Sequence, residues 1–172
     1  MNEIEIKQTV ENLIDTFLDA GKLSLELRKK GLIKETKSDN TPVSNGDLEV
    51  NKLITEKIRQ LNPDIPIVSE ETSENKSNTN LKNFWLIDPI DGTYDYINNL
   101  DEFTINAGLI INNKPVAGLI NAPAKNRMFY SYDKNCAFEL INEKPIKLNC
   151  EKNFDKNEIK FVSYSNKIKP EI

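Results

Sequence analysis

The spacing of apolar residues changes once along this chain, and that change limits the folds the chain can adopt. Up to Leu61 the apolar side chains recur every three or four positions, which is the period of an amphipathic helix. Beyond Pro63 they gather in short runs that are typical of strands. Helices followed by strands predict an α+β protein, because each kind of element must bury its apolar face against a partner layer.

We therefore predict two N-terminal helices, over residues 4–30 and 44–61, packed on one face of a mostly antiparallel sheet. Gly31 can end the first helix, and Ser44 with Asp47 has the spacing of a capping box at the start of the second. A short helical segment is predicted at 94–99. The expected strands cover residues 65–69, 84–88, 103–111, 115–122, 128–132, 137–141 and 159–163, with a hairpin turn at 112–114.

Composition and charge exclude several classes of protein. The 172 residues are enough for one domain with its own core, and 38% of them are hydrophobic. The net charge of −4 offers no basic field for a nucleic-acid backbone, so we expect no nucleic-acid partner. No apolar run approaches the ~20 residues that span a bilayer, and no signal peptide is evident. We expect a cytoplasmic protein with two reduced cysteines, Cys136 and Cys150.

The chain contains no histidine, and this absence excludes several common kinds of active site. A Ser-His-Asp triad, a Cys-His pair and a histidine-bound zinc all need an imidazole. Proton transfer would therefore depend on Asp, Glu, Lys or Tyr side chains, or on water activated by a metal ion.

Two aspartates, Asp88 and Asp91, follow an apolar run and are the strongest candidates for a functional site. Pro89 is expected to set a turn after the strand that delivers Asp88, and Gly92 would let the backbone approach a ligand closely. Thr93 can begin a helix whose N–H groups face an anion. Two carboxylates this close repel unless a positive charge lies between them, and oxygen ligands without His or Cys favour Mg²⁺ over zinc.

Two further acidic blocks lie at the ends of neighbouring elements. Glu70 and Glu71 follow the run 65–69, and Asp47 lies at the start of the second helix. Each block also has a purely structural interpretation. The D-x-x-D-G-T pattern fits an ordinary turn, the two glutamates fit the solvated edge of a loop, and Asp47 fits a helix cap. Their occurrence together, each at the end of an element, favours a shared function.

These blocks resemble the inositol monophosphatase-like superfamily of Mg²⁺-dependent, lithium-sensitive phosphatases, and within it the CysQ type of 3'(2'),5'-bisphosphate nucleotidases. The family pattern K-x-D-x-[ST]-P-V is similar to residues 37–43, P-D-x-P-[IV]-[LV]-S-E-E to residues 63–71, and D-P-x-D-G-T to residues 88–93. Segments 102–106 and 114–123 follow in register. The resemblance implies the N-terminal part of the layered fold of these phosphatases, carried by residues 1–172 as a single metal-bearing domain.

The resemblance also implies the metal ligands. Glu70, Asp88 and the backbone carbonyl of Ile90 would bind a first Mg²⁺. Asp88 and Asp91 would hold a second, and Glu70 would also touch a third, weaker site.

The catalytic and phosphate-binding roles are implied in the same way. Thr93, aided by Asp47, would orient the metal-bound water that attacks phosphorus, and Glu70 would complete the catalytic set. The N–H groups of Gly92 and Thr93 would hold the phosphate.

The chain departs from the family pattern in two places. The W-D-x-A-A motif, whose Asp completes the second metal site, has no counterpart, because Trp85 is the only tryptophan. Residues 161–166 resemble the segment V-S-R-S-H that leads into the family's second half, and residues 94–101 lack that family's usual lysines and arginines. We therefore expect the C-terminal domain to be absent, the second metal site to be incomplete, and an exposed apolar surface that favours homodimers.

Three interpretations of function stay open. The first is Mg²⁺-dependent removal of the 3'-phosphate from adenosine 3',5'-bisphosphate, with inositol-phosphate hydrolysis as its nearest rival. The second is a shortened, non-catalytic remnant with residual metal binding. The third is a structural α+β domain whose acids are all caps and turns. Under the first interpretation, we expect the binding partner to be a small phosphorylated molecule.

Overall fold

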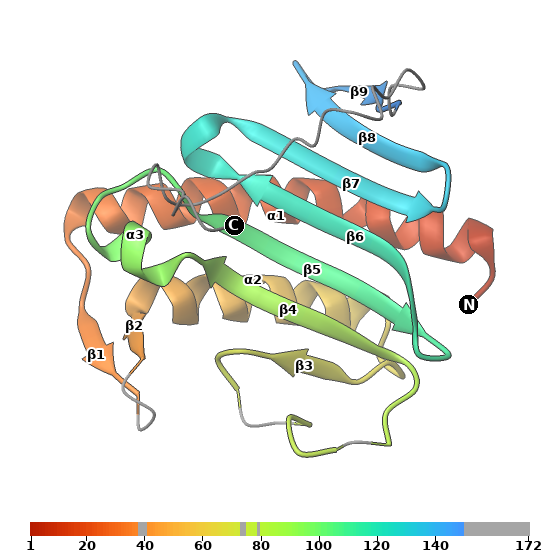
Figure 1. Ribbon diagram of the computed structural model, residues 1–172, viewed down its shortest axis with the longest axis horizontal. Coiled ribbons are helices and arrows are strands. Elements are labelled where there is room, and N and C mark those ends of the chain that lie inside the picture. The colour runs from red at the N-terminus through yellow and green to blue at the C-terminus, as the bar shows by residue number, and fades with distance from the viewer. Residues whose placement is uncertain (38–40, 73–74, 79, 150–172) are drawn as a thin grey trace, which may run out of the picture.

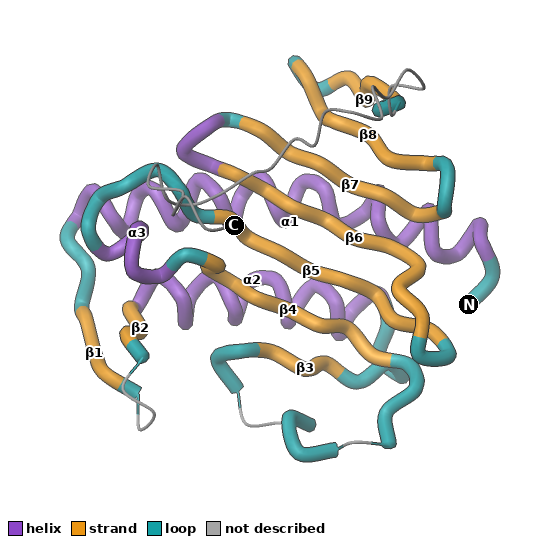
Figure 2. The backbone as a smooth tube through the Cα atoms, viewed as in Figure 1, coloured by secondary structure: helices purple, strands orange, loops and turns teal. Residues whose placement is uncertain are grey.

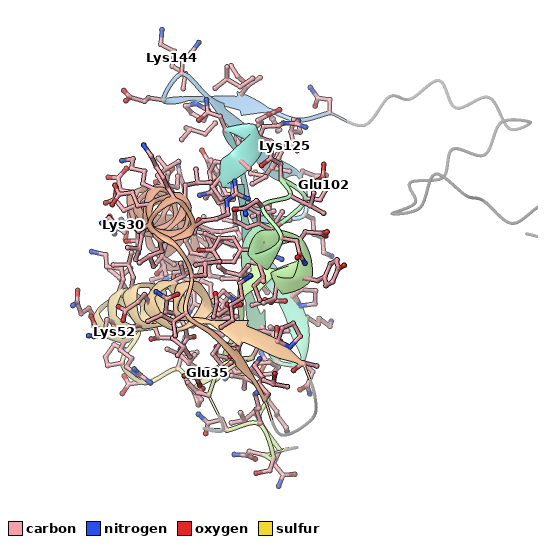
Figure 3. The ribbon with its side chains drawn as sticks, turned by 90° about the vertical axis from the view of Figure 1, so that its left-hand side faces the viewer. Lys30, Glu35, Lys52, Glu102, Lys125 and Lys144 are labelled. Carbon is pink, nitrogen blue, oxygen red and sulfur yellow. The ribbon has the colours of Figure 1, made fainter. Side chains whose placement is uncertain are left out.

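The structure is a computed structural model that describes residues 1–37, 41–72, 75–78 and 80–149. Two long helices lie on one face of a sheet, as the apolar periods predict (Figures 1 and 2). Seen from the side, the helices form one layer and the sheet the other (Figure 3). The predicted α+β class is confirmed.

Both helices begin with a capping box, and the one at Ser44 is as predicted. Helix α1 (Glu3–Lys30) starts with a capping box, in which the Glu5 N–H donates to Asn2 Oδ1 at 2.9 Å. Gly31 ends it with a φ of +98°. Helix α2 (Asn45–Leu61) has Ser44 as its N-cap and a second capping box.

The main sheet has seven strands in the order in which they occur along the chain. Only the first pair is parallel, and the five other pairs are antiparallel. Its strands are β3 (Ile67–Ser69), β4 (Phe84–Asp91), β5 (Thr104–Ile111), β6 (Lys114–Ala122), β7 (Arg127–Asp133), β8 (Cys136–Ile141) and β9 (Lys144–Lys147).

Four shorter elements complete the described chain. Strands β1 (Lys34–Thr36) and β2 (Pro42–Ser44) pair antiparallel and lead into α2. Helix α3 (Thr93–Ile97) follows β4, and the 3₁₀ turn Pro123–Lys125 follows β6. The β5–β6 hairpin turns on Asn112 and Asn113, both with positive φ, as a two-residue hairpin requires.

The core lies between the helices and the sheet face that they cover. Trp85, Ile87 and Leu109 on that face are at most 1% exposed, and they pack with apolar residues of both helices such as Phe17 and Ile54. This burial is the main stabilising contribution to the fold.

The other face of the sheet carries apolar residues that no described element covers. Leu86 alternates with buried Trp85 and Ile87 along β4 and is 50% exposed. Ile120 on β6 is 46% exposed. We call this the outer face; Figure 1 views the sheet from this side, with both helices behind it.

Two strand predictions need correction. Strand β4 does not end at Asp88, and Pro89 sets no turn there, because pairing with β5 continues as far as Asp91 around a bulge. Strand β9 was not predicted, since Pro145 and two lysines dominate its four residues. Proline and lysine are tolerated there because β9 is an edge strand. The predicted strand 159–163 lies outside the described residues.

Gly46 allows a close contact between the first turn of α2 and the Tyr96 ring of α3. A Cβ at this position would overlap the Tyr96 phenol, whose hydroxyl donates to the Ser24 carbonyl at 2.7 Å. We expect Gly46→Ala to lower the free energy of unfolding by about 1–3 kcal/mol, although alanine favours helices. Urea unfolding would measure the change.

The control is Lys52→Ala, in the same helix, because Lys52 points away from the sheet (Figure 3). This variant should be nearly neutral or slightly more stable. A Gly46→Ala protein as stable as the wild type would contradict the close packing.

Candidate metal centre

The predicted site residues come together at one end of the sheet. Strands β3 and β4 are parallel, so their C-terminal ends lie on the same side, next to β2 and α3 (Figure 1). The Glu70 N–H, just after β3, donates to the Ile87 carbonyl at 3.1 Å. Glu70 is therefore held beside the segment of β4 that carries Asp88.

A bulge in β4 places Asp88 and Asp91 on the same face. Residues three apart in a regular strand point to opposite faces. Here Asp88 pairs with Asn106 and Asp91 pairs with Thr104, so three steps along β4 match two steps along β5. Because Asn106 and Thr104 share a face, the extra residue brings both aspartates to the outer face.

The Asp88 carboxyl group is partly buried and lies next to like charges. Its Oδ1 is buried and has no hydrogen-bond partner. Burial, together with the negative charges of Glu70 and Asp91, raises the pKa of Asp88 to about 7. A divalent cation would relieve both effects, so this environment fits a hard cation with oxygen ligands.

Asp47 connects the start of α2 with the start of α3. Its Oδ2 accepts from the Ser44 N–H at 2.8 Å and from the Ser44 hydroxyl at 2.6 Å, while its Oδ1 lies 3.1 Å from Thr93 Oγ1. The same Thr93 hydroxyl lies 3.0 Å from the Ile90 carbonyl, so its proton is shared between two acceptors. Asp47 is only 1% exposed, which fixes this arrangement.

Gly92 shapes the turn between β4 and α3. Its φ is +93°, and a Cβ there would lie 2.7 Å from the Glu102 carbonyl oxygen. Only glycine accommodates both conditions. The backbone of Gly92 and Thr93 is thereby held beside the aspartates, although α3, with five residues, has only a small dipole.

Lys37 forms an ion pair with both glutamates. Its Nζ lies 2.8 Å from Glu71 Oε1 and 3.2 Å from Glu70 Oε1. Burial lowers the pKa of Lys37, but its bonds and charge interactions with Glu71 and Glu70 outweigh burial and raise it. For Glu71, whose side chain is 3% exposed, burial outweighs the pair and raises the pKa. The ion pair of Lys37 with the two glutamates therefore stabilises the fold by less than its short N–O distances suggest.

The acids do not yet form a closed ligand set. Within the described ranges, no three acidic or cysteine side chains are arranged as a preassembled metal site. Glu70 is bound by Lys37, and the Lys76 ammonium donates to the Glu70 carbonyl. Carboxylates that face each other without a metal ion between them repel, so this open arrangement of the acids is expected.

All seven predicted residues lie in this region: Asp47, Glu70, Asp88, Ile90, Asp91, Gly92 and Thr93. Three neighbours were not predicted as site residues: Lys37, Glu71 and Asn106. Lys37 and Asn106 belong to motifs that the sequence shows, but only the fold places them against acids distant in the chain.

We expect Lys37→Gln to lower the free energy of unfolding by about 1–3 kcal/mol, because buried Glu71 would lose its cation. Urea unfolding would measure this loss. Lys34→Gln is the matched control, since Lys34 is exposed on β1 and should change stability little. Equal stability of the two variants would show that the ion pair contributes nothing.

The model of the inositol monophosphatase family matches residues 6–171. Two curated relatives are both named 3'(2'),5'-bisphosphate nucleotidase CysQ. The one from Haemophilus influenzae is 38% identical over 127 residues, covering 70% of this chain and 47% of the relative. The one from Aggregatibacter actinomycetemcomitans is 32% identical over 141 residues, covering 81% and 52%. The chain thus spans about half the length of the curated relatives it matches.

Solved structures share the fold. An IMPase from Thermotoga maritima superposes with a TM-score of 0.67 at 28% identity, over 79% of this chain and 52% of that one. An IMPase/NADP phosphatase complexed with Mg²⁺ and phosphate has a TM-score of 0.66 at 21% identity, over 77% and 51%. In the described part of this chain, no helix has the length and apolar character to cross a membrane.

Proposed function

Because this chain belongs to the inositol monophosphatase family, we propose that it is the metal-bearing part of a phosphatase for small phosphorylated molecules. The observation that carries the proposal is the buried, unpartnered Oδ1 of Asp88 beside the charges of Glu70 and Asp91. Such an environment destabilises the protein unless a cation binds there.

The donor set favours Mg²⁺. Glu70, Asp88, Asp91 and the Ile90 carbonyl offer only oxygen atoms, which hard divalent cations prefer. Bound there, Mg²⁺ would supply an activated water as nucleophile and neutralise charge on the phosphoryl group. The number of ions belongs to this proposal.

The remaining residues would position the reacting groups. Asp47 holds the Thr93 hydroxyl at 3.1 Å, so Thr93 can orient a water molecule from a fixed position. The backbone N–H groups of Gly92 and Thr93 would hold a phosphate oxygen. The absence of histidine is compatible with this function, because a bound cation would supply the activation of water that an imidazole provides in other sites.

The substrate we favour is adenosine 3',5'-bisphosphate, losing its 3'-phosphate. Support comes from the names of the curated relatives and from the residues shared with the CysQ pattern. Inositol phosphate is the rival substrate, and a non-catalytic remnant with residual metal binding is the rival function. A cytoplasmic location and homodimer formation stay predictions from the sequence.

The activity test measures phosphate release from adenosine 3',5'-bisphosphate and from inositol 1-phosphate, with Mg²⁺ and with a chelator. Release from the nucleotide should depend on Mg²⁺ and fall at least ~100-fold in Asp91→Asn, because a cation ligand is lost. The control is Asp133→Asn, an exposed acid at the end of β7.

Two results would decide against this proposal. Folded protein without Mg²⁺-dependent release from either compound would favour the non-catalytic remnant. Release from inositol 1-phosphate alone would show that inositol phosphate, and not the nucleotide, is the substrate.

Metal binding can be tested without any substrate. Mg²⁺ at 100 times its dissociation constant should stabilise the wild-type fold by about 2.7 kcal/mol, seen as a higher melting temperature. Asp88→Asn should abolish this response. Without Mg²⁺, at pH 8 and so above the pKa of about 7, the same substitution should stabilise the fold, because it removes a carboxylate whose charged form is disfavoured by burial and like charges. A wild-type melting temperature that does not respond to Mg²⁺ would contradict the proposed centre.

A further inference from the structure

Two buried oxygen atoms without partners lie on directly paired residues. In the part of the chain that the structure describes, the buried side-chain polar atoms without a hydrogen bond are Asp88 Oδ1 and Asn106 Oδ1. Asp88 on β4 and Asn106 on β5 are opposite each other in the register. Cross-strand partners have Cβ atoms about 4.5–5.5 Å apart, so the two side chains are neighbours on the outer face.

Asn106 has a defined orientation. Its Nδ2 donates to Asp91 Oδ2 at 3.1 Å. The reverse orientation would turn the amide oxygen toward a carboxylate, which offers no proton. The amide nitrogen is therefore used by Asp91, and Oδ1 is the atom that lacks a partner.

Both unpartnered atoms are acceptors, so they cannot satisfy each other. A buried acceptor without a partner destabilises the fold, and here two occur side by side. A structural role for Asn106 would explain the bond to Asp91 but not the buried oxygen. A cation, or a water in the shell of a cation, would satisfy both atoms at once.

We propose that Asn106 is a further residue of the metal centre: its Nδ2 orients Asp91, and its Oδ1 contacts the divalent cation directly or through one water. This inference rests on the proposed function, since it needs a cation beside Asp88. It adds a neutral oxygen from β5 to a set of ligands that otherwise comes from β4 and the end of β3.

The test titrates the 172-residue protein with Mn²⁺ and measures free Mn²⁺ by electron paramagnetic resonance, so the readout is independent of activity. Asn106→Ala removes both interactions and should weaken binding about tenfold or more. Asn106→Asp keeps an oxygen in the same place and should bind at least five times more tightly than Asn106→Ala.

Added charge alone could mimic that recovery, so a second variant controls for it. Ile120 lies on the outer face, opposite Asn106 on β6, and is 46% exposed. Ile120→Asp in the Asn106→Ala background adds the same charge one strand farther away and should not restore binding. Ser131→Ala, on the outer face of β7, should bind Mn²⁺ as the wild type does.

Each alternative outcome has a distinct meaning. If Asn106→Ala binds Mn²⁺ like the wild type, or Asn106→Asp binds as weakly as Asn106→Ala, Oδ1 has no part in the centre. If Ile120→Asp restores binding as well as Asn106→Asp does, the effect is charge alone and the inference is wrong. If the wild type binds no Mn²⁺, the proposed function fails first. Circular dichroism spectra of every variant should match the wild type.

Discussion

The extra residue between Asp88 and Asp91 is the feature on which the candidate site depends. Helices α1 and α2 cover one face of the sheet, so a regular β4 would direct one of these aspartates into the apolar core. The bulge changes the phase of the strand and brings both carboxylates to the outer face. Two like charges are then neighbours, and one has a buried oxygen without a partner. The proposal of a cation at this place follows from this local geometry.

Asp47 contributes both to the stability of helix α2 and to the geometry of the candidate site. Asp47 caps α2 through Ser44, a contact worth about 1 kcal/mol in typical helices, and with its other oxygen it holds Thr93. The structural and the functional interpretations of Asp47 therefore do not exclude each other. The same holds for Gly92, whose positive φ forms the turn and also brings backbone close to the aspartates.

The local elements were largely predictable because their signals are short-range. The capping boxes at Asn2 and Ser44 and the turn at Asn112–Asn113 are decided by residues within four positions of each other. The prediction of a turn at Pro89 was wrong because proline is also compatible with a bulge, and only pairing with β5 distinguishes the two. Strand β9 was missed because its polar residues show no buried face.

The sequence by itself determined the α+β class, the two capped helices, and a set of acids that resembles a known family of phosphatases. Those conclusions depend on periodicity and on motifs of a few residues. Only the tertiary structure placed Lys37 against Glu71 and Asn106 against Asp91, contacts between residues 34 and 15 positions apart. Such pairs depend on strand register and on the direction in which each side chain points. Both are set by the packing of whole layers, which no local pattern records.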